Sequence, residues 1–320
     1  MTMNCKQFVF QFIVHRSEFI VSMTKHWNRV TVVGCGLVGA SFALALRHVG
    51  ACASVAGWDA APRVLDEAQR LGAIDETDEA FNEGGVSQSD LIYLATPVGQ
   101  IVEFLRAGAP HVKPGAVVTD AGSTKVEVCR AARACTQKGW RFVGGHPVAG
   151  SHLRGPAHAR ADLFEGAPYV LTAPEDGSDP SALAALVETL SLLGARVRVM
   201  RAAEHDRALA RLSHLPQLVS CALAATVSEE TDEVERSALA GAGYRDMTRL
   251  AASPWGIWRD ILATNPSEVA AALDSLIPKL AAMRDGLREH SRQLLEDPEG
   301  ARGGDNLAAA RTLFGRIRPS

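Results

Sequence analysis

Residues 29–59 read RVTVVGCGLVGASFALALRHVGACASVAGWD, and this stretch decides the fold of the N-terminal half of the chain. The β-branched run at 30–33 predicts a buried strand. Three glycines follow at once with the spacing GxGxxG, and residues 40–49 predict a helix with few breakers. A second short strand, predicted at 54–58, ends on Asp59, twenty residues past the last glycine. The order strand, glycines, helix, strand and acid is typical of a dinucleotide-binding βαβ unit.

Each of these residues has a physical role in binding a dinucleotide. Gly34 allows the tight turn, Gly36 lets the backbone approach a pyrophosphate, and Gly39 lets the helix pack close to the strand. The helix N-terminus offers free N–H groups and the positive end of its dipole to phosphates. Asp59 can accept both ribose hydroxyls of NAD and would repel the extra phosphate of NADP. The alternative is a βα turn that is merely glycine-rich. We expect NAD as the cofactor, with these contacting residues: Gly34, Gly36, Leu37, Val38, Gly39, Asp59, Thr96 and Ser123.

Length, charge and cysteine content narrow the class of protein. The 320 residues and 47% hydrophobic content suggest two domains with packed cores. The net charge of −3 gives no general attraction for nucleic acid or for an anionic membrane. The six cysteines form no CxxC and no metal-ligand spacing, so we expect free thiols in a reducing cytosol and no metal site.

The first 28 residues precede the predicted glycine-loop unit and need a separate interpretation. They contain short apolar runs at 8–14 and 19–21, but no small-residue cleavage site follows. A signal peptide is one interpretation. We favour a disordered N-terminal extension over residues 1–28, or a start assigned too early, with Met23 a plausible first residue.

The pattern up to about residue 200 predicts a doubly wound parallel sheet, because strands alternate with helices. Further strands are expected at 90–96, 116–120, 141–143, 169–172 and 196–200, and further helices at 62–71 and 181–193. Ligands of such sheets bind at the carboxyl ends of the strands. The polar residues that follow those ends, Thr96, Ser123 and His146, are therefore candidates for chemistry.

Beyond residue 200 the pattern is helical. One long run covers 202–229, with a kink expected at Pro216, and residues 265–268 have the composition of a helix start. The apolar stripe that follows exceeds what one short bundle buries. We expect a Rossmann-type domain over 29–200 and an all-helical substrate-binding and dimerisation domain over 201–320, which makes the chain a homodimer.

Four segments then stand together in one sequence. They are the glycine loop at 34–39 with Asp59, DAGSTK at 120–125, GHPVAGS at 145–151, and GYRDMTR at 243–249, which SHLP at 213–216 precedes. From about residue 28 to about residue 290, the chain resembles the prephenate/arogenate dehydrogenase family of tyrosine biosynthesis. The resemblance implies NAD-dependent oxidative decarboxylation of a cyclohexadienyl substrate, with prephenate giving 4-hydroxyphenylpyruvate.

The resemblance also implies catalytic roles for two residues. His146 matches the family's catalytic histidine, and a neutral imidazole has the basicity to take the proton of the substrate hydroxyl. The alternative is an ordinary turn histidine before proline. Ser123 matches a serine between substrate and nicotinamide, although it could equally cap a helix start. Lys125, in the same turn, can be read as a solvated surface charge.

Two carboxylates on the substrate call for paired cations. Arg249 matches the family's carboxylate-binding arginine, and Arg245 would share its helix face. The alternative for either is local pairing with Asp246 or Asp260. By the same resemblance His214 faces the substrate, against the alternative of a helix-packing histidine.

Two positions depart from the family's common pattern. Gln217 stands where many members carry a second histidine near the substrate side chain, and His152 stands where an acidic residue is usual. Losing an acid removes a partner for the ammonium group of arogenate, which favours prephenate. A relative acting on an amino-substituted ring remains an alternative. Outside the family, we weighed a hydroxyacid dehydrogenase, whose catalytic lysine motif is absent, and a nucleotide-sensing regulator, which would not need the catalytic set.

Overall fold

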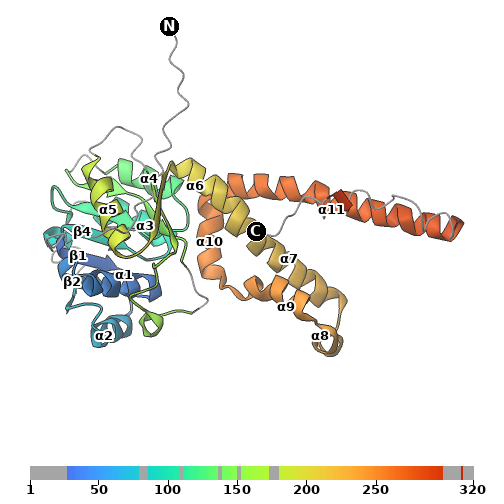
Figure 1. Cartoon of the computed structure of the whole chain (residues 1–320), viewed down its shortest axis with the longest axis horizontal. Coiled ribbons are helices and arrows are strands. Elements are labelled where there is room, and N and C mark those ends of the chain that lie inside the picture. Colours follow the sequence, from blue (N-terminus) through green and yellow to red (C-terminus); the bar gives the residue numbers. More distant parts are fainter. Residues whose placement is uncertain are drawn as a thin grey trace, which may run out of the picture.

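The computed structural model of this chain describes residues 27–78, 86–108, 111–135, 139–149, 153–172, 180–297 and 311–312. An α/β part and a helical part lie side by side, and α11 (Pro266–Glu296) of the helical part projects beyond the other helices (Figure 1). The predicted disorder of residues 1–26, the start at Met23 and most of the C-terminal tail lie outside the described residues. Residues 27 and 28 already belong to the first strand, which begins earlier than predicted.

The α/β part is built on a six-stranded, all-parallel sheet with the order β3-β2-β1-β4-β5-β6. The strands are β1 (Trp27–Val33), β2 (Cys52–Trp58), β3 (Glu76–Thr77), β4 (Leu91–Leu94), β5 (Val117–Asp120) and β6 (Arg141–Val143). The connecting helices are α1 (Leu37–His48), α2 (Pro62–Arg70), α3 (Val98–Gly108) and α4 (Val126–Arg133), with a 3-10 turn at Val86–Gln88. The strand order reverses between β1 and β4, where doubly wound sheets bind their ligands. The predicted Rossmann-type fold is confirmed.

The remaining strands correct one prediction. β7 (Gly145–Pro147), β8 (Pro168–Thr172) and β9 (Arg196–Met200) form a separate three-stranded sheet, in which β7 and β8 are antiparallel. The sequence pattern predicts β8 and β9 within the parallel sheet and His146 past a strand end, whereas His146 lies within β7. A three-residue strand carries too little pattern to be recognised, because its existence depends on pairing with β8. Pro147 is tolerated there because β7 is an edge strand.

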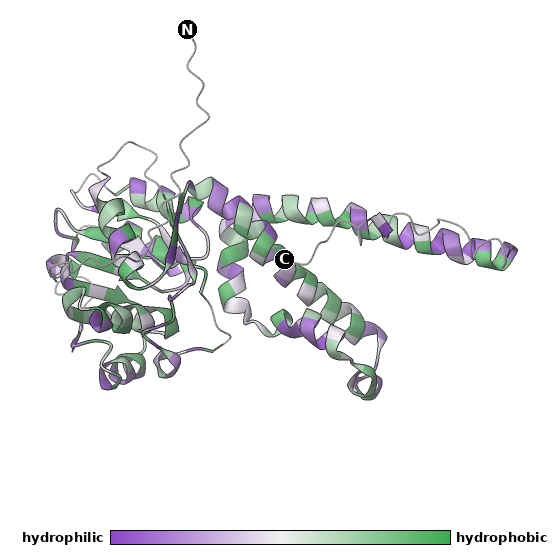
Figure 2. Cartoon of the chain, in the orientation of Figure 1, coloured by the Kyte–Doolittle hydropathy of each residue, from purple (hydrophilic) through white to green (hydrophobic). Residues whose placement is uncertain are grey.

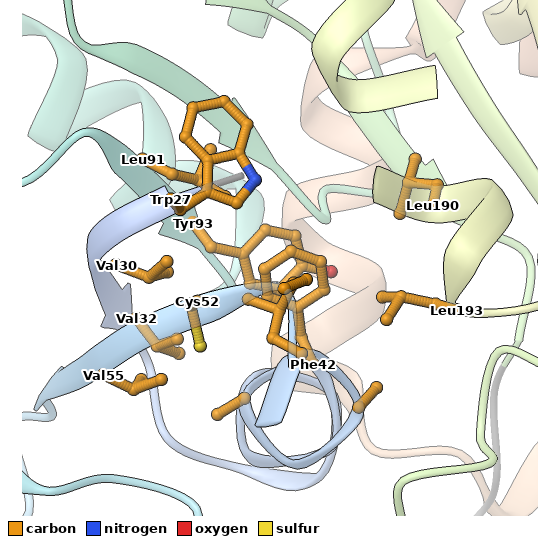
Figure 3. Close-up of a cluster of buried hydrophobic side chains, with 14 of the residues drawn as sticks. Trp27, Val30, Val32, Phe42, Cys52, Val55, Leu91, Tyr93, Leu190 and Leu193 are labelled. Atoms are coloured by element: carbon orange, nitrogen blue, oxygen red, sulfur yellow. The ribbon is translucent and has the colours of Figure 1, made fainter. Parts of the chain in front are cut away.

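The core fills both faces of the parallel sheet. Phe42 of α1 stacks on Tyr93 of β4, with ring centroids 3.8 Å apart and planes at 19°. Leu190 and Leu193, in and just after α5 (Ser181–Leu192), belong to the same cluster (Figure 3). Both leucines are almost fully buried, so they anchor this helix against the sheet. The indole N–H of Trp27 donates to Thr189 of α5 at 3.0 Å, so β1 is tied to this covering helix.

The helical part begins with a continuous run that has one irregular turn. The run consists of α6 (Ala202–Leu209), a π-helical turn (Ala210–His214) and α7 (Leu215–Glu230). Pro216 lies in the first turn of α7, directly after the π turn, so the predicted kink coincides with a change of helix type. The rest comprises α8 (Glu233–Leu239), α9 (Ala242–Thr248), a 3-10 turn (Arg249–Ala252), α10 (Trp255–Thr264) and α11. The predicted helix start at residues 265–268 is confirmed, with Pro266 in the first turn.

The helical part leaves much apolar surface uncovered in a single chain. Apolar residues lie along α7 and α11 (Figure 2), yet α7 buries only Gln217 and Ser220, and α11 only Val269 and Ala272. Within the described residues, no helix combines the length and the apolar character needed to cross a membrane.

Candidate active site

The glycine loop has the shape that a dinucleotide requires. Gly34 has φ +92°, and a Cβ there would lie 2.8 Å from the Ala95 carbonyl group. A Cβ on Gly39 would lie 1.9 Å from the carbonyl oxygen of Gly34, so only glycine allows α1 to approach β1 this closely. A Cβ on Gly36 would meet nothing within 4 Å, so the loop is open at this position. Leu37 starts α1, and no side chain caps the N–H groups of its first turn at the N-cap residue Gly36.

Asp59, directly after β2, holds this loop in place. Its Oδ2 accepts a hydrogen bond from the backbone N–H of Cys35 at 3.0 Å, and its Oδ1 accepts one from Ala61 at 2.9 Å. A carboxylate has further lone pairs for ribose hydroxyls. The donor set, the open cradle at Gly36 and the helix N-terminus therefore fit a dinucleotide.

Thr96 and Ser123 lie where the prediction put them, just past β4 and β5. The Thr96 methyl group lies 2.8 Å from a Cβ built on Gly34, so Thr96 borders the glycine loop. Ser123 is partly buried, and α4 begins only at residue 126, so the predicted N-cap role of Ser123 is wrong. The first N–H groups of α4 are capped from the other part of the molecule. Asp206 accepts from the backbone of Lys125 at 2.7 Å and of Val126 at 2.9 Å.

The prediction that Lys125 is a solvated surface charge is also wrong. Lys125 is fully buried instead of solvated, and it pairs with the buried carboxylate of Asp120. Its ammonium group also donates to the Gly145 carbonyl at 2.6 Å, and Asp120 accepts from the Gly145 N–H at 3.0 Å. Removing one partner of such a buried pair typically costs about 3–5 kcal/mol, because the other charge remains buried. The pair fixes the ends of β5 and β7 together.

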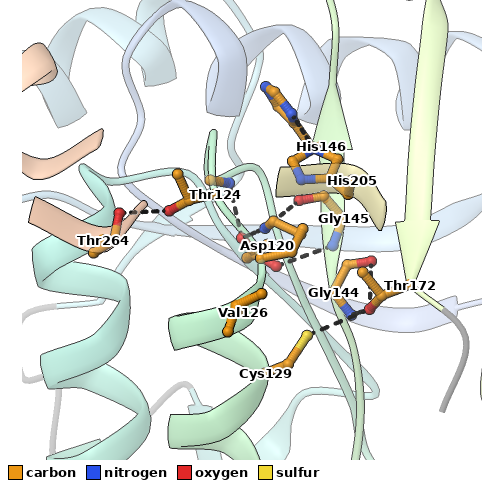
Figure 4. Close-up of polar contacts among 12 residues, drawn as sticks. Asp120, Thr124, Val126, Cys129, Gly144, Gly145, His146, Thr172, His205 and Thr264 are labelled. Atoms are coloured by element: carbon orange, nitrogen blue, oxygen red, sulfur yellow. Dashed lines mark hydrogen bonds and ion pairs between the residues drawn. The ribbon is translucent and has the colours of Figure 1, made fainter. Parts of the chain in front are cut away.

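His146 follows on β7 and starts a chain of buried polar contacts (Figure 4). Its Nδ1 lies 2.8 Å from Nε2 of His205 in α6, and Nδ1 of His205 lies 2.7 Å from Oδ1 of Asp206. Nε2 of His146 has no hydrogen-bond partner in the part of the chain that the structure describes. Burial, followed by the neighbouring His205, Lys125 and His214, lowers the pKa of His146 well below 6.5. His146 is therefore neutral near pH 7.

The chain crosses the junction between the two parts, and other contacts hold the same junction. The hydroxyls of Thr124 and Thr264 lie 2.7 Å apart, and Asn265 donates to the Asp206 carbonyl at 2.9 Å. Asp260 of α10 accepts from the N–H of Gly99 in the first turn of α3 at 3.1 Å. The α/β and helical parts are thus joined around the histidine chain.

His214 and Gln217 lie one turn apart after this junction. The His214 ring is buried edge-on against Trp258, its Nδ1 has no hydrogen-bond partner among the described residues, and burial lowers its pKa to about 4. The Gln217 side chain donates to the Leu250 carbonyl at 2.8 Å. It therefore braces the turn that carries Arg249.

The two arginines differ in their surroundings. Arg249, at the start of the 3-10 turn, is exposed and makes no ion pair with any residue that the structure describes. Arg245 in α9 is exposed and donates to the Ala240 carbonyl at 2.6 Å, so one of its donors is engaged locally. Asp260, the alternative partner, pairs with Arg259 instead. The predicted departure at residue 152 lies outside the described residues.

Four residues of this site are not predicted from the sequence: Asp120, His205 and Asp206 have no assigned role, and Lys125 is predicted to be a solvated charge. A charged pair five residues apart in one strand-to-helix turn was the available signal for Asp120 and Lys125. His205 and Asp206 resembled ordinary residues of an amphipathic helix, and no local pattern marked them. Among the described residues, no group of three or more His, Cys, Asp or Glu side chains is arranged to hold a metal ion.

Comparisons with known proteins cover both parts of the chain. Residues 42–199 match the family model described as the prephenate dehydrogenase nucleotide-binding domain, and residues 201–297 match the model of the prephenate dehydrogenase dimerization domain. The chain is 33% identical to the prephenate dehydrogenase of Bacillus subtilis over 279 residues, which is 85% of this chain and 74% of that protein.

Solved structures agree with the sequence comparison. The Aquifex aeolicus prephenate dehydrogenase in complex with hydroxyphenyl propionate and NAD+ is similar with a TM-score of 0.76 and 31% identity, covering 86% of this chain and 96% of that one. The Synechocystis arogenate dehydrogenase is also similar, with a TM-score of 0.69 and 31% identity, covering 86% of this chain and 99% of that one.

Proposed function

Because the chain belongs to the prephenate dehydrogenase family, we propose that it converts prephenate to 4-hydroxyphenylpyruvate with NAD+, as a step of tyrosine biosynthesis. The observation that carries this proposal is the buried, neutral His146, whose Nε2 is unpaired within the described chain. A proton acceptor in this state suits the oxidation of a ring alcohol near neutral pH.

The cofactor is NAD, and the residues proposed to hold it are those of the glycine loop and its surroundings. Gly34, Gly36 and Gly39 shape the loop, and the N–H groups of Leu37 and Val38, in the first turn of α1, would donate to the phosphates. Asp59 is proposed to accept the ribose hydroxyls, with Thr96 and Ser123 at the adjoining strand ends. When bound, NAD+ supplies the acceptor for the hydride that leaves the ring carbon bearing the hydroxyl.

His146 manages the proton of that hydroxyl. As the C–H bond breaks and the alcohol becomes a carbonyl, the hydroxyl proton passes to Nε2 of His146. Carbon dioxide then leaves the opposite ring carbon, and the electron pair of the broken C–C bond makes the ring aromatic. The oxygen takes the proton back and becomes the phenol, so the histidine ends neutral. Ser123 is proposed to share the hydrogen bond to the same hydroxyl.

The two substrate carboxylates require cations, and the exposed guanidinium of Arg249 is proposed to bind one of them. Arg245 is the candidate for further support, although its bond to Ala240 leaves fewer donors free. His214 has a buried Nδ1 without a partner in the described chain, which supports a role as a hydrogen-bonding group toward the substrate. Gln217 then acts mainly by holding the Arg249 turn.

Arogenate is the second candidate substrate. The chain is 31% identical to the Synechocystis arogenate dehydrogenase, the same identity as to the Aquifex aeolicus prephenate dehydrogenase, and this similarity supports arogenate as a candidate. The two substrates differ only in the side chain, which is a keto acid in prephenate and an amino acid in arogenate. The proposed chemistry at His146 is the same for both.

The helical part is matched by a dimerization-domain model, and we propose that the chain is a homodimer formed through residues 201–297, with NAD bound by the unit before residue 200. The uncovered apolar faces of α7 and α11 support this proposal.

NADH formation by the purified protein, with NAD+ and either prephenate or arogenate, tests the function. We expect turnover with prephenate. The variant His146→Asn should lower kcat by about 100- to 10 000-fold, because it removes the proton acceptor, while the Kd for NAD+ stays unchanged. Full activity of this variant would contradict the assigned role. Turnover with arogenate alone would transfer the proposal to that substrate.

A further inference from the structure

The contacts behind His146 determine which of its ring nitrogens carries the proton. Asp206 accepts from two backbone N–H groups, of Lys125 and Val126, and its Oδ1 also lies 2.7 Å from Nδ1 of His205. A carboxylate can only accept, so Nδ1 of His205 must be the protonated nitrogen. Burial lowers the pKa of His205, which keeps the ring neutral and leaves its Nε2 as an acceptor.

The same reasoning passes to the next ring. His205 Nε2 lies 2.8 Å from Nδ1 of His146, and an acceptor at this distance requires a proton on Nδ1 of His146. A neutral imidazole with its proton on Nδ1 has a free lone pair on Nε2. That nitrogen is the one without a partner in the described chain. In the opposite tautomer Nε2 would be a donor, and it could not take a proton from a hydroxyl.

We propose that His205, oriented by Asp206, is a positioning residue that holds neutral His146 in the tautomer whose Nε2 accepts the substrate proton. The inference rests on the proposed function for the identity of that substrate, but the tautomer itself is a property of the free protein. When His146 becomes charged, its Nδ1–H still donates to His205, and the negative charge of Asp206 lies behind it.

The burial of these three side chains supports the positioning role of His205. His205 is fully buried, and Asp206 and His146 are 1% and 9% exposed, so water does not compete for the ring nitrogens along the chain. Asp206 is poorly suited for a test, because it also caps α4. Both side-chain hydrogen bonds of His205 belong to the histidine–aspartate series, so substituting His205 tests that series directly.

Two variants of His205 separate positioning from packing. His205→Phe keeps a ring but cannot accept the hydrogen bond from the Nδ1–H of His146, so kcat with prephenate should fall by about 100-fold. The KM for NAD+ should not change, because the glycine loop between β1 and α1 includes neither His205 nor its hydrogen-bond partners. In His205→Gln the amide oxygen can accept that hydrogen bond, and kcat should be at least about tenfold above that of His205→Phe. Asn265→Ala is the matched control, because it removes another buried bond to Asp206 without touching either histidine.

The tautomer is measured directly by long-range 1H–15N NMR on protein labelled with 15N-histidine, with the His146 signals assigned by comparison with His146→Asn. We expect Nδ1-protonated His146 in the wild-type protein and in Asn265→Ala, and a shift toward the Nε2-protonated form in His205→Phe. Nε2-protonated His146 in the wild-type protein would overturn the inference, whether or not the variants fold. Equal kcat for the Phe variant and the wild type would also overturn it. If the wild-type protein turns over neither prephenate nor arogenate, the proposed function fails while the tautomer result stands.

Discussion

Within the described part of the chain, three histidines are buried, and each should make the stability of the fold depend on pH. Burial is the largest cause of a lowered pKa for His146, His205 and His214. An unfolded histidine has a pKa of about 6.5. Between that value and the lower folded pKa, the unfolded chain binds protons that the folded chain does not, so the free energy of unfolding falls as the pH falls. We expect the thermal midpoint to decrease steadily from about pH 7 to about pH 5.

His214 offers the sharpest test of this prediction, because its pKa is lowered to about 4 and its Nδ1 has no partner in the described chain. His214→Asn should flatten the dependence of the thermal midpoint on pH. His48→Asn, at an exposed position, should leave the curve as it is. Parallel curves for His214→Asn and the wild type, measured by circular dichroism, would show that the buried rings do not set the slope.

At the scale of single residues, the sequence predicts a role only where a residue belongs to a local motif. Gly34, Gly39 and Asp59 were predicted from their spacing, and the structure gives each of the two glycines a close backbone approach that excludes a side chain. The partner of His146 could not be predicted, because His205 is 59 residues away and only the packing of α6 against β7 brings them together. The burial of Lys125 could not be predicted, because a lysine is almost never fully buried without a charged partner. Only the geometry of the turn shows that Asp120 is that partner.

At the scale of the element, two glycines of the βαβ unit have different roles, because we expect one to affect cofactor binding and the other to affect the stability of the fold. A Cβ on Gly36 would meet nothing within 4 Å, whereas one on Gly39 would lie 1.9 Å from a backbone oxygen. Gly36→Ala should therefore keep the wild-type free energy of unfolding but weaken NAD+ binding by about tenfold or more, because the methyl group occupies the approach of the pyrophosphate. Gly39→Ala should lose about 3 kcal/mol of stability, because α1 must move away from β1.

Urea unfolding and titration calorimetry with NAD+ measure these two quantities separately. If Gly36→Ala bound NAD+ as tightly as the wild type, the phosphates would have to lie elsewhere than over this loop.

Elements whose pattern is local were predicted well, and elements defined by distant pairing were not. The strands β1, β2, β4 and β5 are short apolar runs that a parallel sheet buries on both faces. β7 has three residues and exists because it pairs with β8, which lies more than twenty residues later. The π turn at Ala210–His214 has no sequence signature of its own, although Pro216 correctly marked the place where the helix changes.

At the scale of the whole molecule, the helical part is incomplete as a single chain. The side chains of Ile277, Leu280 and Leu287 on α11 are more than half exposed, and their spacing places them along one side of the helix. A second copy of the chain would cover them. Because α7 directly follows His214 and braces the Arg249 turn through Gln217, we expect dimerisation to support the side of the site proposed to bind the substrate carboxylates.

Two negative charges on that face should therefore separate the copies. We expect the double variant Ile277→Glu/Leu280→Glu to elute in light-scattering chromatography with the single-chain mass of 34.0 kDa, against twice that mass for the wild type. Lys279→Glu changes charge on another side of α11 and should remain a dimer. The separated chains should still bind NAD+, since the glycine loop belongs to the α/β part, but kcat/KM for prephenate should fall by about tenfold or more as the carboxylate-binding turn loses its support. A dimeric double variant would place the interface on another face of the helical part, and a monomer with full turnover would show that each chain's site is complete alone.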